Sequence, residues 1–153
     1  MKEKLHFEVE IEAPRAVVWD AMLGDDTYRD WTSAFGEGGY YEGSWEKGKR
    51  IRFLGPGGSG GMVSEIAENR AHEYLSIHHL GIINEGLEDT TSDAARDWAQ
   101  VYENYTFSDA GTGFTRVEVD TETPSDHAEA FREMWPRGLA RLKEIAERAA
   151  VGG

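Results

Sequence analysis

The chain has 153 residues, a length that suits one domain with a single hydrophobic core. Its 16 lysines and arginines stand against 29 aspartates and glutamates, so the formal net charge at pH 7 is −13. Such a charge repels phosphate backbones and anionic lipids, and no basic patch offsets it, which argues against a nucleic-acid partner. The chain contains no cysteine, which excludes disulfides and thiolate metal sites and gives no reason to expect secretion.

The N-terminal segment resembles neither a signal peptide nor a membrane anchor. It begins Met1-Lys2-Glu3-Lys4 and continues with alternating residues rather than an apolar core. No run of residues approaches the ~20 apolar positions that a membrane helix needs. We therefore expect a soluble cytoplasmic protein without membrane insertion, folded as one domain over residues 1–153.

A strand and two short helices are predicted at the start of the chain. Four apolar residues alternate with polar ones, which is typical of a strand with one buried face: Leu5, Phe7, Val9 and Ile11. Pro14 suits the first position of a helix, for which Gly24 is a plausible C-cap. Asp25 or Asp26 would cap a second short helix that carries three aromatic residues, Tyr28, Trp31 and Phe35.

The middle of the chain is predicted to be a β meander. Six β-rich segments follow one another between short turns, and the segments are Tyr40–Trp45, Arg50–Leu54, Met62–Ala67, Glu73–Ile83, Ala99–Phe107 and Phe114–Thr121. Short connections favour antiparallel pairing, so with the N-terminal strand we expect one sheet of about seven strands. In the last segment only one face is apolar, so the sheet needs a single covering layer.

A long helix beginning near Ser125 is expected to form that layer. Apolar residues follow Thr123-Pro124 at steps of three and four: Phe131, Trp135, Leu139, Leu142, Ile145 and Ala149. Pro136 lies inside this pattern and should kink the helix near Arg132–Pro136. The predicted fold class is therefore α+β, a curved antiparallel sheet with two short N-terminal helices and one long C-terminal helix packed across it.

Two segments resemble one protein superfamily. Residues 11–22, IEAPRAVVWDAM, together with Tyr28 and Trp31, are similar to the opening signature of the START-like or SRPBCC superfamily, in the branch related to the activator of heat-shock-protein ATPase. Residues 131–145, FREMWPRGLARLKEI, resemble the closing signature of that branch. The resemblance implies a helix-grip fold, with a cavity between the sheet and the C-terminal helix. Most of these residues are packing residues, so the resemblance concerns the fold more than the activity.

The position of His79 follows from strand alternation. Leu75 and Ile77 are apolar, so His79 should share their inward face while His78 points to water. An inward imidazole would orient a ligand or move a proton. The commoner role for such a side chain is that of a core histidine with its hydrogen bonds satisfied.

The orientation of Glu103 is open. In one register Val101, Glu103 and Tyr105 point inward, and the carboxylate becomes a candidate general base. In the opposite register Tyr102 and Asn104 point inward and Glu103 is solvated. Aromatic side chains occur on both faces, so the alternation does not choose between the two registers.

Other chemistries find little support. Three histidines and two glutamates are close in sequence, His72, His78, His79, Glu65 and Glu73, but His78 and His79 face opposite ways. We therefore expect no metal and no cofactor. The glycine-rich residues 55–61 lack the Lys-Ser/Thr ending of a P-loop and are predicted to form a hairpin loop. The acidic residues 84–97 form either a lid over the cavity or a solvated loop.

The predicted ligand cavity is lined by aromatic and apolar residues with His79 among them: Trp31, Phe35, Trp45, Phe53, Ile77, His79, Tyr105, Val117, Phe131, Met134 and Trp135. Its roof should be the half of the long helix before Pro136, with the second half serving as plain core. We expect a binding protein for a small hydrophobic or amphipathic molecule, monomeric or weakly dimeric. The alternatives are an enzyme of the cyclase or aromatase type that uses His79 and Glu103, and a co-chaperone-like module with a chaperone partner.

Overall fold

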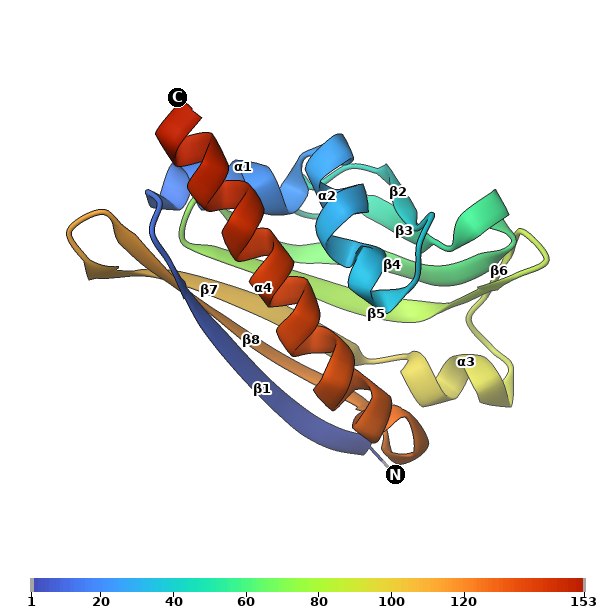
Figure 1. Ribbon diagram of the computed structural model, residues 1–153. Helices are drawn as coiled ribbons and strands as arrows, with labels where there is room; N and C mark the ends of the chain where they lie inside the picture. The colour runs from blue at the N-terminus through green and yellow to red at the C-terminus, as the bar shows by residue number, and fades with distance from the viewer. Residues whose placement is uncertain (1, 153) are drawn as a thin grey trace.

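A computed structural model describes residues 2–152, and its frame is one curved antiparallel sheet of eight strands (Figure 1). The strands are β1 (Lys2–Ile11), β2 (Tyr40–Gly43), β3 (Arg50–Leu54), β4 (Gly60–Arg70), β5 (Tyr74–Asn84), β6 (Leu87–Asp89), β7 (Val101–Gly111) and β8 (Phe114–Pro124). Their order is β1-β8-β7-β5-β4-β3-β2, and β6 pairs with β5. The predicted antiparallel sheet is confirmed, and the additional short strand, β6, lies in the acidic segment predicted as a lid or loop. The predicted domain limits, Met1 and Gly153, lie outside the described residues.

The sequence alternation sets the two faces of the sheet. In the β1–β8 pair, Val9 lies opposite Val117 on the covered face. Glu10 lies opposite Arg116 on the outer face, and their side chains form an ion pair of 2.7 Å. The apolar positions of both strands thus meet the core, and the charged positions meet water.

The helical segments are α1 (Arg15–Leu23), α2 (Asp25–Trp31), α3 (Asp93–Trp98), α4 (Ala128–Gly152) and the short 3-10 turns η1 (Thr32–Phe35), η2 (Pro56–Gly58) and η3 (Ser125–His127). Gly24 ends α1 as predicted and also serves as the N-cap of α2. The prediction of an aspartate N-cap was therefore wrong. Asp25 and Asp26 instead occupy the first turn of α2, where their charge favours the positive end of the helix dipole.

Helix α4 crosses the covered face of the sheet obliquely, and α1 and α2 pack beside it on the same face (Figure 1). Trp135, Leu139 and Leu142 are buried at the predicted spacing. Ala149 was wrongly assigned to this stripe, since it is exposed and Ala146 takes the buried position. The helix is not interrupted at Pro136, which is exposed, and the kink near this residue stays a prediction.

The two halves of α4 cover different parts of the molecule. Leu139, Leu142 and Ala146 in the second half pack into the main core together with α1 and the strands β1 and β8. The first half lies beside η1 and η3. Within residues 2–152, no helix is both long enough and apolar enough to cross a membrane.

Candidate functional site

A cavity of about 460 Å³ lies between the sheet and the first half of α4. Its walls come from α2, η1 and α3 and from the inner faces of several strands, and α4 forms its roof with Phe131, Met134 and Trp135. A pocket of this size is within the range of small-molecule sites.

The cavity brings together most of the residues predicted for it. Ten of them line it: Trp31, Phe35, Trp45, Phe53, Ile77, His79, Tyr105, Phe131, Met134 and Trp135. Val117 does not line it, and its assignment was wrong. It lies on β8 opposite Val9 and Phe107, in the filled core. Alternation identifies the inward face of a strand but not the part of the strand that borders empty space.

A chain of hydrogen bonds crosses the strands at one end of the cavity. His79 Nδ1 lies 2.7 Å from Ser64 Oγ, and His79 Nε2 lies 3.1 Å from Glu103 Oε1. The Tyr105 hydroxyl donates to the other oxygen of the Glu103 carboxylate. Ser64, His79, Glu103 and Tyr105 therefore form one connected polar group, hereafter the polar chain.

Strand pairing places the polar chain. A register shift in the β4–β5 pair, between Val63 and Ser64, puts Ser64 directly opposite His79. Such irregularities re-aim side chains, and they occur preferentially near functional sites. In β7 the structure has the register in which Glu103 and Tyr105 point inward, and Tyr102 lies on the outer face stacked on His78.

Two members of the polar chain have fixed roles in its hydrogen bonds, because a carboxylate only accepts and a protonated phenol donates. The Glu103 carboxylate accepts the hydrogen bond from His79 Nε2, and His79 Nδ1 shares its hydrogen bond with the Ser64 hydroxyl, which can donate or accept. Burial, followed by the charge of the Glu103 carboxylate, raises the pKa of Tyr105 well above its ordinary value. Tyr105 is therefore a hydrogen-bond donor at neutral pH.

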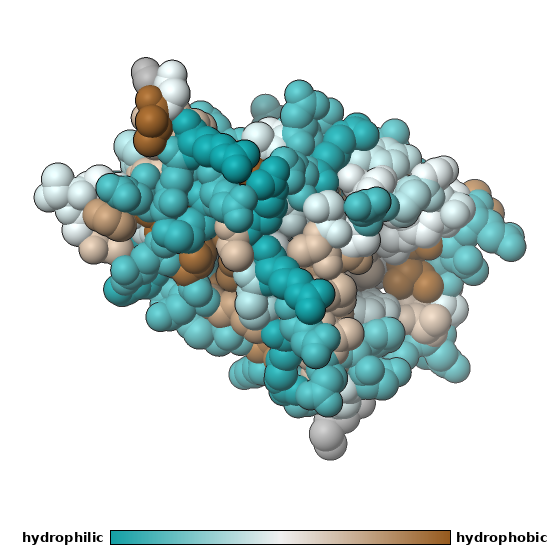
Figure 2. Space-filling view, in the orientation of Figure 1, coloured by the Kyte–Doolittle hydropathy of each residue, from teal (hydrophilic) through white to brown (hydrophobic). Residues whose placement is uncertain are grey.

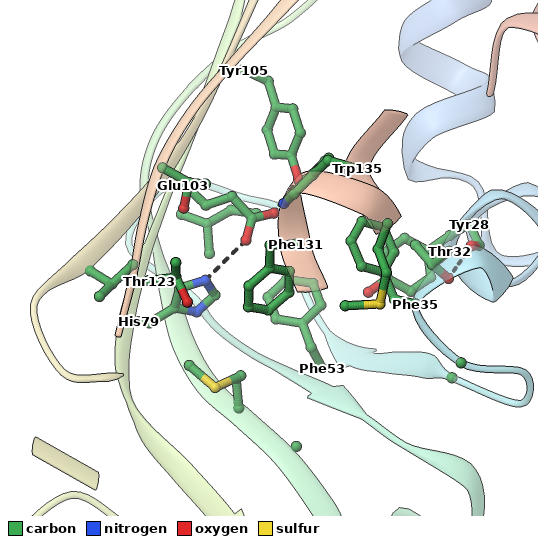
Figure 3. Close-up of a pocket in the computed structure, with 18 of the residues that line it drawn as sticks. Tyr28, Thr32, Phe35, Phe53, His79, Glu103, Tyr105, Thr123, Phe131 and Trp135 are labelled. Atoms are coloured by element: carbon green, nitrogen blue, oxygen red, sulfur yellow. Dashed lines mark hydrogen bonds and ion pairs between the residues drawn. The ribbon is translucent and has the colours of Figure 1, made fainter. Parts of the chain in front are cut away.

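Aromatic rings form the rest of the wall. Figure 3 shows Glu103 and His79 at one end of the cavity and Tyr28 and Phe35 at the other, with Phe53 and Phe131 in view between them. Phe53 meets the His79 ring edge-on at a centroid distance of 6.2 Å, and Phe35 packs against Trp135 at 4.9 Å. These rings bury apolar surface and line the empty space.

Two polar groups of the wall have no partner among residues 2–152. They are the indole N–H of Trp45 and the hydroxyl of Thr123, both of which are buried. An unpaired buried donor or hydroxyl is costly, so such groups usually meet a ligand or a water molecule. Both residues line the cavity.

The segment around α3 borders the cavity at the surface. Ser92 caps this short helix by accepting a hydrogen bond from the Ala95 amide. At its end, Trp98 lines the cavity and contacts the rings of His127 and Phe131. Figure 2 shows a recessed apolar area between α3 and the η1 region, beside the hydrophilic outer surface of α4.

Four residues of the site were not predicted from the sequence. Three of them line the wall, Tyr28, Trp98 and Thr123, and the fourth, Ser64, belongs to the polar chain. Ser64 had no signal, because its pairing with His79 depends on a register shift. Thr123 could have been found by extending the alternation of β8 two residues beyond Thr121. Trp98 lines the cavity from the C-terminal end of α3.

Comparisons with known proteins identify the fold. No protein-family model matches the sequence, and no curated protein matches it significantly. Solved structures do match. The Aha1 dimer from Colwellia psychrerythraea has a TM-score of 0.70 at 16% identity, covering 95% of this chain and 96% of that one. Protein MLL2253 from Mesorhizobium loti has a TM-score of 0.69 at 16% identity, covering 95% and 98%.

A third match is DynU16, a protein in the dynemicin biosynthetic locus, with a TM-score of 0.66 at 17% identity. The alignment covers 96% of this chain but 48% of DynU16. Matches at identities this low establish a shared fold and carry no information about activity. The chain therefore has the START-like, helix-grip fold that its two sequence signatures predicted.

Proposed function

We propose that this protein binds a small amphipathic molecule in the cavity between the sheet and α4. The observation that carries the proposal is the cavity of about 460 Å³, which is lined mainly by aromatic and aliphatic side chains and has one polar end. Filled cores leave few voids larger than a water molecule. An empty apolar cavity of this size lowers the free energy of unfolding. A ligand that fills it raises the free energy of unfolding.

The polar groups of the wall favour an amphipathic ligand over a plain hydrocarbon. The unpaired Trp45 N–H requires an acceptor, and the Thr123 hydroxyl accepts or donates. The polar chain supplies further sites at Glu103. A ligand with oxygen or nitrogen atoms can bond to the partly exposed Glu103 carboxylate, while its apolar body lies against the rings.

The proposal is tested with N-phenyl-1-naphthylamine, a neutral apolar dye whose fluorescence rises in an apolar site. We expect saturable binding by the wild type and an increase in melting temperature. The M134W variant fills the cavity from its roof and should weaken dye binding about tenfold or more.

Arg137→Trp is the matched control, because Arg137 is exposed on the same helix three residues further along. This variant should bind the dye as the wild type does. Absence of saturable binding, or equal binding by the M134W variant, would contradict the proposal.

A second candidate function is acid–base catalysis on the bound molecule. The observation that favours it is the convergence of His79 and Tyr105 on the Glu103 carboxylate. A carboxylate held in this way can remove a proton from the carbon next to a ligand carbonyl, which forms an enolate and a neutral Glu103. In D2O the acid then exchanges its proton for deuterium and returns deuterium to the carbon.

The test is α-hydrogen exchange of 2-tetralone in D2O, followed by proton NMR. Catalysis predicts faster loss of the α-proton signal with the wild type than with E103Q, by about 100-fold. Glu118→Gln removes a carboxylate from the outer face of β8 and should exchange as the wild type does. Equal rates for the wild type and E103Q would exclude this role for Glu103.

A further inference from the structure

The strongest unexplained feature of the cavity is its charge. Among the described residues that line it, none is lysine or arginine, and two are glutamates, Glu103 and Glu122. The formal net charge of the whole chain, with these two glutamates included, is −13. Residues 2–152 therefore offer no fixed positive charge to a bound anion in the cavity wall.

Glu103 still has hydrogen-bonding capacity in the cavity. Its two oxygens each accept one hydrogen bond, from His79 and from Tyr105. A carboxylate has about four acceptor sites, so each oxygen can accept one more. The side chain is 22% exposed, and in Figure 3 its carboxylate lies between His79 and Tyr105 at one end of the cavity.

The surrounding groups suit a positive charge. Faces of phenylalanine, tyrosine and tryptophan rings attract cations, and a cation removed from water is stabilised most where rings and a carboxylate act together. Thr123, whose buried hydroxyl has no partner within residues 2–152, belongs to the same wall. An ammonium group has three donors to satisfy.

We propose that the ligand of this cavity is an amphipathic amine, with a protonated nitrogen at Glu103 and an aromatic or aliphatic body against the rings. This inference rests on the proposed ligand-binding function and narrows it to one chemical class. Carboxylates and phosphates are rejected because the partly buried Glu103 charge repels them and the wall contains no lysine or arginine to pair with them.

The experiment compares three probes that share a phenyl ring and a four-carbon chain: 4-phenylbutylamine, 4-phenylbutan-1-ol and 4-phenylbutyrate. Each displaces N-phenyl-1-naphthylamine from the wild type at pH 7 and at constant ionic strength. We expect the amine to bind about tenfold more tightly than the alcohol, and the carboxylate to bind more weakly than either.

Two variants locate the effect. E103Q keeps the size of the side chain and should reduce amine affinity to that of the alcohol, with little change for the alcohol. E118Q removes the same charge from the outer face of β8, so it should keep the preference for the amine. Melting temperatures of both variants establish that they are folded.

The outcomes separate the two claims. If the dye binds but the amine is no better than the alcohol, or if E103Q keeps the preference, the amine inference is overturned and ligand binding stands. If neither the dye nor any probe binds to the folded wild type, ligand binding itself fails and the amine inference fails with it.

Discussion

Glu103 is the residue on which the chemistry of the cavity depends. It is the one carboxylate that receives hydrogen bonds from both His79 and Tyr105. Without these donors a carboxylate in this position would be poorly solvated, and the free energy of unfolding would fall. The polar chain therefore stabilises the same charge that a ligand would use.

Tyr105→Phe removes one donor from Glu103 and keeps the ring. We expect the free energy of unfolding to fall by about 1–2 kcal/mol, because a buried carboxylate loses a hydrogen bond. Urea denaturation monitored by tryptophan fluorescence measures the change. Tyr102→Phe is the control on the outer face, where the ring is 41% exposed, and should change stability by less than about 0.5 kcal/mol. Equal effects of the two substitutions would contradict the role given to Tyr105.

Because of Tyr105, we expect the free energy of unfolding to fall at alkaline pH. Its pKa lies well above the ordinary value of 10.0 because of burial and the nearby Glu103 charge. Above pH 10 the unfolded chain releases this proton and the folded chain keeps it. The stabilisation is therefore complete below pH 10 and is lost as the pH rises above it, by up to about 1.4 kcal/mol per pH unit.

The measurement is the unfolding free energy of the wild type and of Tyr105→Phe at pH 9, 10 and 11. Phenylalanine has no proton to lose, so the stability advantage of the wild type should shrink between pH 9 and pH 11. A constant difference across this range would show that Tyr105 ionises normally in the folded state.

The two halves of helix α4 have different roles: the second half packs into the core, and the first half lines the cavity. Leu139 and Leu142 fill the core, whereas Phe131 and Trp135 border the empty space. Gly138 lies between these halves, and it allows Phe35 and Trp31 to approach the helix backbone. A Cβ atom at this position would lie 3.0 Å from Phe35 Cε2 and 3.5 Å from Trp31 Cε3.

Gly138→Ala should therefore change the cavity more than the stability. Alanine favours the helix by about 1 kcal/mol relative to glycine, which offsets the cost of moving the Phe35 ring. Phe35 lines the cavity, so a shift of its ring changes the shape of the binding space, and we expect dye affinity to fall about threefold or more. Gly152→Ala, in the same helix with no atom within 4 Å of the added Cβ, is the control and should leave binding unchanged. Unchanged dye affinity of the Gly138→Ala variant would contradict this account.

The charge of the whole molecule is a cost to the folded state. A formal net charge of −13 on a chain of this length produces self-repulsion that is stronger when the chain is compact. Ion pairs reduce it locally, for example where Arg141 contacts Asp30 at 2.7 Å and ties α4 to α2. The remaining acidic side chains repel one another across the surface.

Added salt should raise the melting temperature at pH 7. Going from about 10 mM to about 150 mM sodium chloride shortens the screening length from about 30 Å to about 8 Å, which weakens this repulsion. Differential scanning calorimetry measures the shift, for which we expect a few degrees. The same series near pH 4.7, the isoelectric point from the sequence, should show a smaller shift. A melting temperature that falls with salt at pH 7 would mean that ion pairs outweigh repulsion.

The architecture was predictable from local patterns. Alternation in Leu5–Ile11 and in Phe114–Thr121 identified strands and their buried faces, and three- and four-residue steps identified α4. These signals depend on side-chain periodicity along one segment, which is a property of the chain itself. The same alternation placed His79 on the inner face.

The arrangement of the cavity depended on contacts between segments that are distant in the chain. The register of β7, which turns Glu103 inward, is set by pairing with β5 and β8, and both faces of β7 carry aromatics that leave the alternation ambiguous. The partnership of Ser64 with His79 requires a register shift. Val117 is inward yet remote from the cavity, because the packing of α1 and α4 determines where space is left unfilled. Local periodicity determines which way a side chain points, and only tertiary packing determines what it meets there.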